Sequence, residues 1–393
     1  MRIGLFFLVL AYMLSQFFRV FLAVLAPVLE ADLGAGPEAL ARASGLWFLT
    51  FALMQIPVGW ALDRIGPRRI VAVLLGFGGA GGSLMLALAR APLAIDGAMV
   101  LIGVGCSSVL MAAYYILART CPAALFGTLA GAIIGFGSFG NLAGSVPLAW
   151  AIEAFGWRQS VLGLAVMTMA VAVALALFVR DPPRAGPAGP QGSLLELLAM
   201  PTLWPILWMM AAAYGPGAAL RGLWIGPYLA DVQGADAAGI GRVTLGMALA
   251  MIAGNFAYGP LDRLTGTRKG VVLTGNLLGA ACFLALWAAP GAGVWQVSAL
   301  MAAAGFFGSS FAMIMAHGRA FLPPHLVGRG VTLINLFGIG GAGLMQLASG
   351  WLHHRLAAAS PDPAAPYGAI FLGFGLILLA GCIVYAVSRD RTD

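Results

Sequence analysis

The feature that most constrains this chain is a series of twelve apolar runs, each long enough to cross a lipid bilayer. An α-helix needs about 20 residues to span the hydrocarbon core. Runs of this length lie near 5–28, 44–62, 70–89, 96–118, 126–150, 159–179, 203–229, 240–261, 270–289, 294–317, 330–352 and 367–387. Hydrophobic residues make up 61% of the chain and charged residues 9%, a balance that a water-soluble domain cannot bury. The sequence therefore predicts an all-α polytopic membrane protein with twelve transmembrane helices in the lipid bilayer.

A stretch rich in proline and glycine, 181–192, separates the first six runs from the last six. We therefore expect an N-terminal six-helix bundle over 1–180, a cytoplasmic linker over 181–200 and a C-terminal six-helix bundle over 201–393. Within the linker, 193–200 is predicted to form a short amphipathic helix on the membrane surface.

The positions of lysine and arginine predict how the chain is oriented. With a cytoplasmic N-terminus, fourteen of the 21 basic residues fall at cytoplasmic ends and loops, five fall on the other side and two fall within spans. Cytoplasmic loops carry the excess of basic residues in membrane proteins. We therefore expect both termini in the cytoplasm and the protein in the inner (plasma) membrane. The same bias explains the net charge of +7 without a nucleic-acid partner.

Two of the predicted spans contain an arginine, Arg19 in the first and Arg221 in the seventh. A guanidinium in hydrocarbon costs at least a few kcal/mol, so it usually has a partner or a function. Tyr12 and Tyr214 each precede one of these arginines by seven residues, which is two turns on one face of an α-helix. All fourteen acidic residues lie at span ends or in loops. The pattern predicts an anionic substrate bound by both arginines; the alternative is that each side chain extends to the interface.

The second half of the chain repeats the chemistry of the first half after about 200 residues. The segment 59–69, which contains Asp63 and Arg64, returns as 259–269, which contains Asp262 and Arg263. Arg119 at the end of the fourth span returns as Arg319 at the end of the tenth. Glycines of the fifth and eleventh spans also match, namely Gly135, Gly137 and Gly140 with Gly338, Gly340 and Gly343. Such a repeat predicts two pseudo-symmetric halves related by an axis along the membrane normal.

The segment 59–69 resembles the loop motif of the major facilitator superfamily, G-x-x-x-D-R/K-x-G-R-R, with Pro67 as an extra residue before the basic pair. With twelve spans and a central linker, this resemblance covers the whole chain and implies the major facilitator fold and alternating access. It also implies that charged pairs lock the cytoplasmic gate. The gating residues would be Asp63, Arg64, Arg119, Asp262, Arg263 and Arg319, with Asp63–Arg119 and Asp262–Arg319 as the pairs. The alternative is that these charges serve only topology.

A narrower resemblance concerns the two arginine-containing spans. The segments 16–27 and 219–229 resemble the first and seventh helices of the sugar-phosphate permease group, which includes organophosphate:phosphate antiporters. The resemblance implies an anion held between Arg19 and Arg221, whose planar forks suit phosphate and carboxylate oxygens. That group commonly has a lysine in the second helix and a histidine in the fifth, whereas this chain has Gln55 and Asn141. The predicted substrate is therefore a small organic anion such as a phosphate ester, phosphonate or carboxylate.

Other polar and aromatic residues within the spans are candidates to line the binding site. They are Gln16, Gln55, Tyr114, Tyr115, Asn141, Trp224, Asn255, Tyr258, Asn335 and Gln346. Hydrogen bonds between helices would explain each of them equally well. Gln16 is favoured because it lies three residues before Arg19. His317 near the end of the tenth span is a less favoured proton relay. The glycines of the fifth and eleventh spans also invite comparison with nitrate/nitrite carriers, but close helix packing explains them better.

These features together predict a secondary active transporter whose two halves rock around the arginines. Because no carboxylate lies within a span to carry protons, we expect exchange or facilitated passage. We expect no cofactor and no metal, since the four cysteines lack metal-ligand spacing. A nucleophile, base or metal cluster at membrane depth is also missing, which argues against an enzyme. We expect a monomer. An exporter of lipophilic, drug-like compounds and a transporter-like membrane sensor are the alternative functions.

Overall fold

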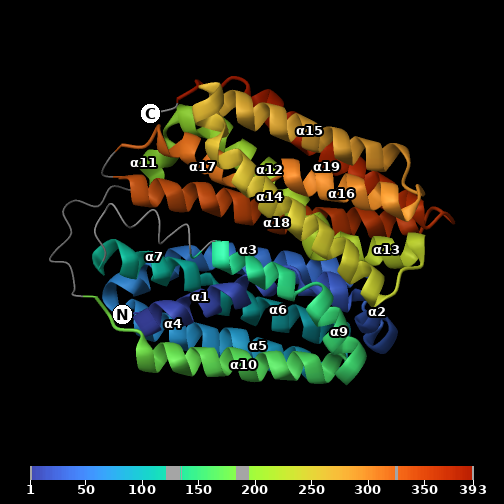
Figure 1. Ribbon diagram of the computed structural model, residues 1–393, viewed down its shortest axis with the longest axis horizontal. Coiled ribbons are helices and arrows are strands. Elements are labelled where there is room, and N and C mark those ends of the chain that lie inside the picture. Colours follow the sequence, from blue (N-terminus) through green and yellow to red (C-terminus); the bar gives the residue numbers. More distant parts are fainter. Residues whose placement is uncertain (1, 121–132, 134, 183–193, 324–325, 392–393) are drawn as a thin grey trace. The chain divides into compact units, whose positions relative to one another are not determined.

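The computed structural model describes residues 2–120, 133, 135–182, 194–323 and 326–391 (Figure 1). Its regular elements, over these residues, are all helical. Ten helices are long and apolar enough to cross a membrane, and the bent pair Ile3–Phe17 and Phe21–Leu33 makes an eleventh span. The remaining predicted span, 126–150, lies partly outside the described residues. The all-helical polytopic fold expected from the sequence is confirmed.

The chain forms two compact units. Unit 1 comprises Met1–Pro187 with Ala237–Gly241, and unit 2 comprises Ala188–Asp236 with Arg242–Asp393. In each unit, the end that carries the repeated loop segment (64–69 or 263–269) is called the motif end here. The opposite end of the same unit is called the far end.

Unit 1 is built from helices that mostly run between these two ends (Figure 1). They are α1 (Arg2–Phe17), α2 (Phe21–Leu33), α3 (Pro37–Arg64), α4 (Pro67–Leu74), the π-helix η1 (Leu75–Ala80), α5 (Gly81–Ala87), α6 (Pro92–Ser107), α7 (Val109–Thr120), α9 (Val146–Phe155) and α10 (Trp157–Phe178). Helix α3 packs on α6, and α10 packs on α5 and η1. The elements α4, η1 and α5 form one continuous span.

Unit 2 contains a second set of helices with a similar order. They are α11 (Leu194–Leu198), the 3₁₀-helix η2 (Pro201–Leu203), α12 (Trp204–Ala219), the π-helix η3 (Leu220–Trp224), α13 (Ile225–Gln233), α14 (Ala237–Thr265, in unit 2 from Arg242 onward), α15 (Arg268–Ala288), α16 (Val294–Phe307), α17 (Phe311–Arg319), α18 (Val327–Ala357) and α19 (Ala364–Tyr385). Helix α12 packs on α18 and α19, and α15 packs on α19 and α16.

Several helices extend beyond the apolar runs that predicted them. Helix α3 starts at Pro37, seven residues before its run, and α18 continues to Ala357, five residues past its run. A backbone leaving the hydrocarbon keeps its internal hydrogen bonds through the polar interface, so the helix outlasts its apolar sequence. Pro37, Pro67 and Pro92 each occupy a first helical position, where the missing N–H costs nothing and φ is already suitable. Hydropathy thus located the spans, while proline positions set several of their starts.

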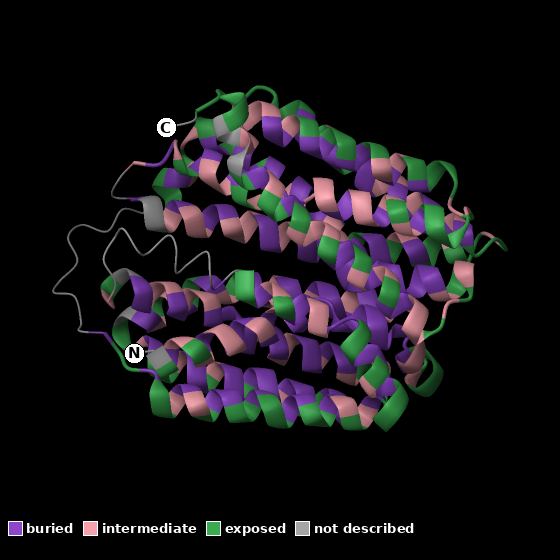
Figure 2. Cartoon of the chain, in the orientation of Figure 1, coloured by how far each residue is buried: buried purple, intermediate pink, exposed green. Residues whose placement is uncertain are grey.

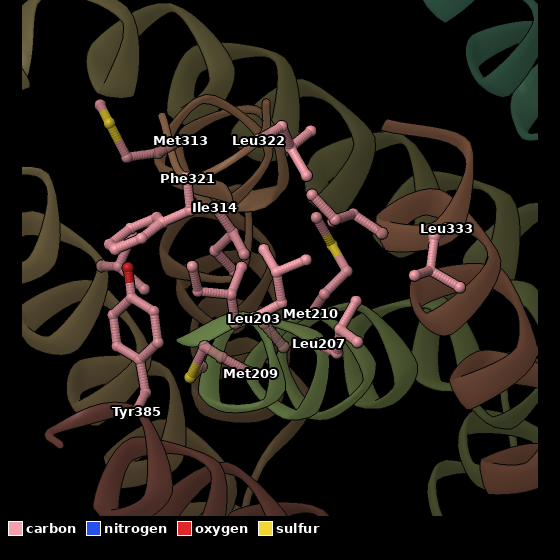
Figure 3. Packing of buried hydrophobic residues seen from close by; sticks show 14 of the residues in the cluster. Leu203, Leu207, Met209, Met210, Met313, Ile314, Phe321, Leu322, Leu333 and Tyr385 are labelled. Atoms are coloured by element: carbon pink, nitrogen blue, oxygen red, sulfur yellow. The ribbon is translucent and has the colours of Figure 1, made fainter. Parts of the chain in front are cut away.

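The core of unit 2 lies around the start of α12 (Figure 3). Leu203, Leu207 and Met210 pack there with Ile314 of α17 and with Tyr385 at the end of α19. The short linker helix α11 contributes to this core, because Leu197 is completely buried while Leu195 is 73% exposed. Helix α11 also packs on α18. The predicted linker helix is therefore present and packs Leu197 into unit 2, while its position on the membrane surface stays a prediction.

The outward faces of the helices carry large apolar side chains whose exposure to water would be unfavourable. Phe77 in η1 and Phe256 in α14 are 70% and 76% exposed, and Trp295 in α16 is 86% exposed. Exposed and buried residues share the same helices, with buried residues turned toward neighbouring helices (Figure 2). A surface of this kind is solvated by lipid acyl chains rather than by water.

Glycines allow the helix backbones to touch, as the sequence predicted for the fifth and eleventh spans. A Cβ on Gly137 would overlap the ring of Tyr12, and one on Gly140 would overlap the backbone of Met13. A Cβ on Gly338 would approach Met210 to 3.1 Å. Close packing is thus confirmed at these three positions, whereas Gly135 and Gly340 have open space.

Candidate functional site

Arg19 lies at a break between two helices of unit 1. Helix α1 ends at Phe17, α2 begins at Phe21, and the two are bent by 48°. Hydrogen bonds of the tighter i→i−3 kind carry the chain through the break, from Arg19 N to the Gln16 carbonyl (3.3 Å) and from Val20 N to the Phe17 carbonyl (3.0 Å). The rings of Phe17, Phe18 and Phe21 pack against one another around it. Aromatic packing rather than proline or glycine therefore accompanies this break.

The Arg19 guanidinium is buried against aromatic faces of α3. The residue is 9% exposed, and its Cζ atom lies 5.6 Å from the Trp47 ring centroid and 5.1 Å from that of Phe51. Attraction between a guanidinium and an aromatic face strengthens when both are removed from water. Trp47 and Phe51 thus hold the cation in place without neutralising it. Neither ring was singled out from the sequence.

Arg221 occupies the matching region of unit 2, again where the α-helix is interrupted. It lies in the π-helix η3, between α12 and α13, and it is 6% exposed. Its Nη1 atom lies 3.5 Å from the Met251 sulfur of α14. Pro216 precedes this segment inside α12 and supplies no backbone N–H for the helix. Isolated π-segments within α-helices frequently mark functional sites.

A tyrosine seven residues before an arginine lies on the same face only in a continuous α-helix, and both helices are interrupted here. The expectation that Tyr12 and Arg19 share one face assumes a continuous helix, whereas α1 ends before Arg19 and the chain bends there. In unit 2, the π-helix likewise begins at Leu220, between Tyr214 and Arg221. Tyr12 packs against Gly137, and the Tyr214 ring lies 5.3 Å from that of Phe311.

Trp224, also predicted to line the site, is completely buried at the end of η3. Its indole N–H donates to Ser349 Oγ of α18 at 2.8 Å. Its ring lies 5.1 Å from the His353 imidazole and 5.9 Å from the Tyr367 ring. Trp224 therefore connects the segment that carries Arg221 to α18 and α19.

Four other predicted lining residues, Gln16, Gln55, Tyr114 and Asn141, lie on several helices of unit 1. Gln55 is buried, and its amide N–H group donates to the Phe51 carbonyl (3.1 Å) and the Ser107 carbonyl (3.3 Å). It thus joins α3 to the end of α6, as a helix–helix hydrogen bond would. Asn141 is buried, whereas Gln16 on α1 and Tyr114 on α7 are half-buried. Their part in substrate binding stays a prediction.

The predicted gate pairs fall partly outside what the structure describes. The side chains of Asp63, Asp262 and Arg263 are not among the described ones. Arg64 stacks on the Trp60 ring at 5.1 Å, and Arg119 stacks on the Tyr115 ring at 4.3 Å. Arg319 is exposed at the end of α17. The pairs Asp63–Arg119 and Asp262–Arg319 therefore stay predictions.

The motif end of unit 1 is closed by a carboxylate that the sequence did not single out. Asp181, just past α10, accepts a hydrogen bond from the backbone N–H of Arg68 at 2.8 Å. The Arg68 Nε atom in turn donates to the Ala176 carbonyl of α10 at 2.7 Å. Gly66 has φ of +108°, and a Cβ there would lie 2.9 Å from the Asp181 carboxylate. The glycine of the loop motif thus leaves room for the acid that caps α4.

Unit 2 repeats this arrangement with different residues. Asp390, just past α19, accepts from the backbone N–H of Lys269 at 3.0 Å and from the Thr267 hydroxyl. Lys269 Nζ donates to the Ala386 carbonyl at 2.6 Å, and Gly266 also has a positive φ, +69°. Partial burial works to raise the pKa of Asp390. The hydrogen bonds from Thr267 and the Lys269 backbone, with the nearby His317, outweigh that effect and hold the pKa below its usual range.

His317, considered from the sequence as a proton relay, lies beside this cap. It is completely buried in α17, and its Nε2 donates to the Arg389 carbonyl at 3.0 Å. Its Nδ1 lies 2.5 Å from the Tyr385 hydroxyl. These contacts tie α17 to the segment after α19.

The far ends are also tied between matching helices. In unit 1, Arg158 Nη2 at the start of α10 pairs with Asp32 at the end of α2, 2.8 Å apart. In unit 2, the Tyr367 hydroxyl at the start of α19 donates to Asp231 at the end of α13. A further ion pair in unit 1 joins Arg42 to the buried Asp96 at 2.8 Å.

A cavity of about 540 Å³ lies within unit 2, and of the residues predicted to line the binding site it includes Tyr258. It is lined by α14, α15 and the end of α16, and includes Tyr258, Thr267 and Phe306. Its walls are mostly apolar, and Arg221 is not among the lining residues. Among the described residues, no group of three or more His, Cys, Asp or Glu could hold a metal ion.

Comparison with known proteins places these features in context. The family model of the Major Facilitator Superfamily matches residues 8–225. The probable sulfoacetate transporter SauU of Cupriavidus necator is 23% identical over 300 residues, covering 70% of each chain. Among solved structures, the D-xylose-proton symporter has a TM-score of 0.78 at 14% identity, covering 98% of this chain and 97% of that one. A bacterial homolog of the human lysosomal transporter Spinster, inward-facing and occupied, has a TM-score of 0.75 at 18% identity, covering 98% and 95%.

Proposed function

Because the chain belongs to the Major Facilitator Superfamily, we propose that this membrane transporter carries a small organic anion bound by Arg19 and Arg221. One observation carries the proposal. Each unit buries one guanidinium at matching places in the repeat, and each lies where its helix is interrupted. Burying two arginines at membrane depth is costly, and a substrate that needs both offsets that cost. The sulfoacetate relative supports an anionic substrate.

The chemistry of the two arginines narrows the substrate class. A guanidinium offers paired N–H donors in a plane, which match two oxygens of a carboxylate, sulfonate or phosphate group. Trp47 and Phe51 lie beside the Arg19 guanidinium, and contacts of this kind leave its positive charge available to attract an anion. The substrate class is therefore small carboxylates, sulfonates, phosphonates or phosphate esters. We propose no preference for sugar phosphates.

The proposed cycle is alternating access by the two halves of one monomer in the inner membrane. The motif ends carry most of the basic residues and face the cytoplasm by the positive-inside rule. The segments around Arg19 and Arg221 bind the anion, and the predicted pairs Asp63–Arg119 and Asp262–Arg319 lock the cytoplasmic gate. Exchange or facilitated passage is the proposed mode, since the spans offer no acidic residue at mid-depth for carrying protons.

The experiment is counterflow in proteoliposomes with sulfoacetate as the probe. Unlabelled sulfoacetate inside the vesicle should drive uptake of labelled sulfoacetate from outside with equal pH on both sides. Arg19→Lys and Arg221→Lys should each lower uptake at least about tenfold, because a point charge replaces a bidentate donor. Arg355→Lys is the matched control: Arg355 is exposed and stacks on Trp351 at 5.2 Å, and its replacement should leave uptake unchanged.

Two results would overturn the proposal. Uptake that is unchanged in both Arg19→Lys and Arg221→Lys would show that neither arginine binds the substrate. Uptake that strictly requires an imposed proton gradient would remove the exchange mode, while a screen of phosphonates and dicarboxylates as competitors would define the substrate.

A further inference from the structure

The segment that carries Arg221 is braced from one side by α18. Trp224 is the last residue of η3, one helical turn after Arg221, and it is completely buried. Ser349 accepts its indole N–H at 2.8 Å. His353, four residues later and therefore on the same face of α18, places its imidazole 5.1 Å from the Trp224 ring with 32° between the planes. One face of α18 thus accepts the indole N–H of Trp224 and also contacts the face of its ring.

His353 is a buried titratable group that the proposed transport cycle does not otherwise use. It is 8% exposed and lies within the span Arg329–Ala357, four residues from its far end. Its ring packs at 4.9 Å on Tyr367 of α19. The Tyr367 hydroxyl donates to the Asp231 carboxylate at the end of α13. A path of adjacent groups therefore leads from an exposed acid to the buried imidazole.

We propose that His353 is a positioning residue that makes anion binding at Arg221 dependent on pH, acting through Trp224. The proposal rests on the proposed function for the identity of the site. Histidine is the side chain whose charge ordinarily changes between pH 5 and 8. A protonated imidazole attracts the electron-rich face of Trp224, whereas a neutral one only packs against it. Proton binding therefore strengthens the contact between His353 and Trp224, which stabilises η3.

The charged and titratable groups near this histidine set the direction of the effect. On the surrounding elements these are Arg221 in η3, Tyr228 and Asp231 in α13, Tyr367 in α19, and His354 and Arg355 on its own helix. Asp231 is the acidic group among them, and it accepts a hydrogen bond from Tyr367, whose ring contacts His353. An added positive charge beside η3 also favours an anion at Arg221. Both effects predict tighter anion binding at acid pH.

The test is counterflow of sulfoacetate at matched internal and external pH between 5.5 and 8.5. Both acid groups of this probe stay ionised over that range, so only the protein titrates. The wild-type KM should be about three- to tenfold lower at pH 5.5 than at pH 8.5, the factor expected from one cation–π contact. His353→Gln should remove this dependence and fix KM near its high-pH value, with kcat much less affected. His354→Gln is the matched control, because His354 is exposed on the same helix, and it should keep the dependence.

A second measurement separates this inference from the proposed function. Tryptophan fluorescence of the purified protein without any anion should change between pH 8 and pH 5.5, since an imidazolium near an indole quenches it. The change should be lost in His353→Gln and in Trp224→Phe but kept in His354→Gln. A fluorescence titration that survives in His353→Gln, or a KM that does not vary with pH in the wild type, would overturn the inference. A normal titration without transport of sulfoacetate or of any phosphonate or dicarboxylate in the screen would overturn only the proposed function.

Discussion

The backbone N–H of Arg68 donates to the carboxylate of Asp181, a residue 113 positions later in the chain, at 2.8 Å. The Arg68 side chain reaches back to the helix that leads to Asp181 and donates to the Ala176 carbonyl at 2.7 Å. An acid thus caps the N-terminus of α4 while a cation caps the C-terminal end of α10. Both contacts suit the helix dipoles. The same reciprocal capping joins α15 and α19 through Lys269 and Asp390.

Removing the acid from this arrangement should destabilise unit 1 without affecting the anion site. Asp181→Ala should lower the free energy of unfolding by about 1 kcal/mol, the usual value of a helix N-cap. The apparent melting temperature in detergent should fall by about 2–4 °C. Glu153→Ala is the control, since Glu153 is an exposed carboxylate at the far end. An unchanged melting temperature for Asp181→Ala would show that the cap contributes nothing.

The corresponding cap in unit 2 should be sensitive to acid. The pKa of Asp390 is lower in the folded protein than its usual value, so its ionised form contributes stability above about pH 4, the ordinary pKa of an aspartate. That contribution should disappear as the pH falls through the lowered pKa. The melting temperature of the wild type should exceed that of Asp390→Asn at pH 7, and the two should converge toward pH 3. A difference that stays constant from pH 7 to pH 3 would contradict this reading.

The contact between α6 and the span α4–η1–α5 should tolerate no side chain at its centre. A Cβ on Gly105 would overlap the backbone of Gly79, and overpacking of this kind typically costs about 1–3 kcal/mol. Gly105→Ala should therefore lower the melting temperature and the yield of monodisperse protein. Gly163→Ala in α10 is the control, because a Cβ there meets nothing within 4 Å, and it should be neutral or slightly stabilising. Equal behaviour of the two variants would contradict the close approach.

The aromatic faces beside Arg19 should affect substrate affinity. Trp47→Leu removes one face from the guanidinium and should raise the KM for sulfoacetate about three- to tenfold, whereas Trp47→Phe keeps a ring and should raise it less. Counterflow at fixed pH measures both. Trp351→Leu removes a cation–π contact at an exposed position near Arg355 and should leave KM unchanged. A KM that rises equally in Trp47→Phe and Trp47→Leu would show that packing volume, not the aromatic face, matters.

The sequence predicted the fold because hydrophobic length and the loop repeat both depend on the chain alone. Apolar runs located the spans. The repeat of 59–69 at 259–269 located Gly66 and Gly266, which have positive φ values and lie just before α4 and α15. The close packing of Gly137 and Gly140 was also foreseen, since small residues are the usual contact between helices in lipid.

The surroundings of the two arginines could not be predicted in the same way. Residues 18–20 contain neither proline nor glycine, so the break at Arg19 depends on how Phe17, Phe18 and Phe21 pack in three dimensions. The π-helix at Arg221 likewise depends on packing, and a count of residues after Tyr214 does not reveal it. Trp47 and Phe51 are brought to Arg19 by tertiary structure alone.

The acidic residues of the two reciprocal caps occupy matching positions in the sequence, but only the structure shows that they cap helices. Asp181 and Asp390 stand 209 residues apart and each follows the last span of its half. Both were interpreted from sequence only as acidic residues outside the spans, because each caps a helix through a backbone N–H group that no residue letter reveals.

The ties at the far ends bear on how the two halves diverged. Asp32 meets an arginine at the start of α10, whereas Asp231 meets a tyrosine at the start of α19. The same pair of helix ends is therefore joined in both halves, by a charged donor in unit 1 and by a neutral donor in unit 2. The two halves thus agree more closely in which helix ends are joined than in which amino acids join them.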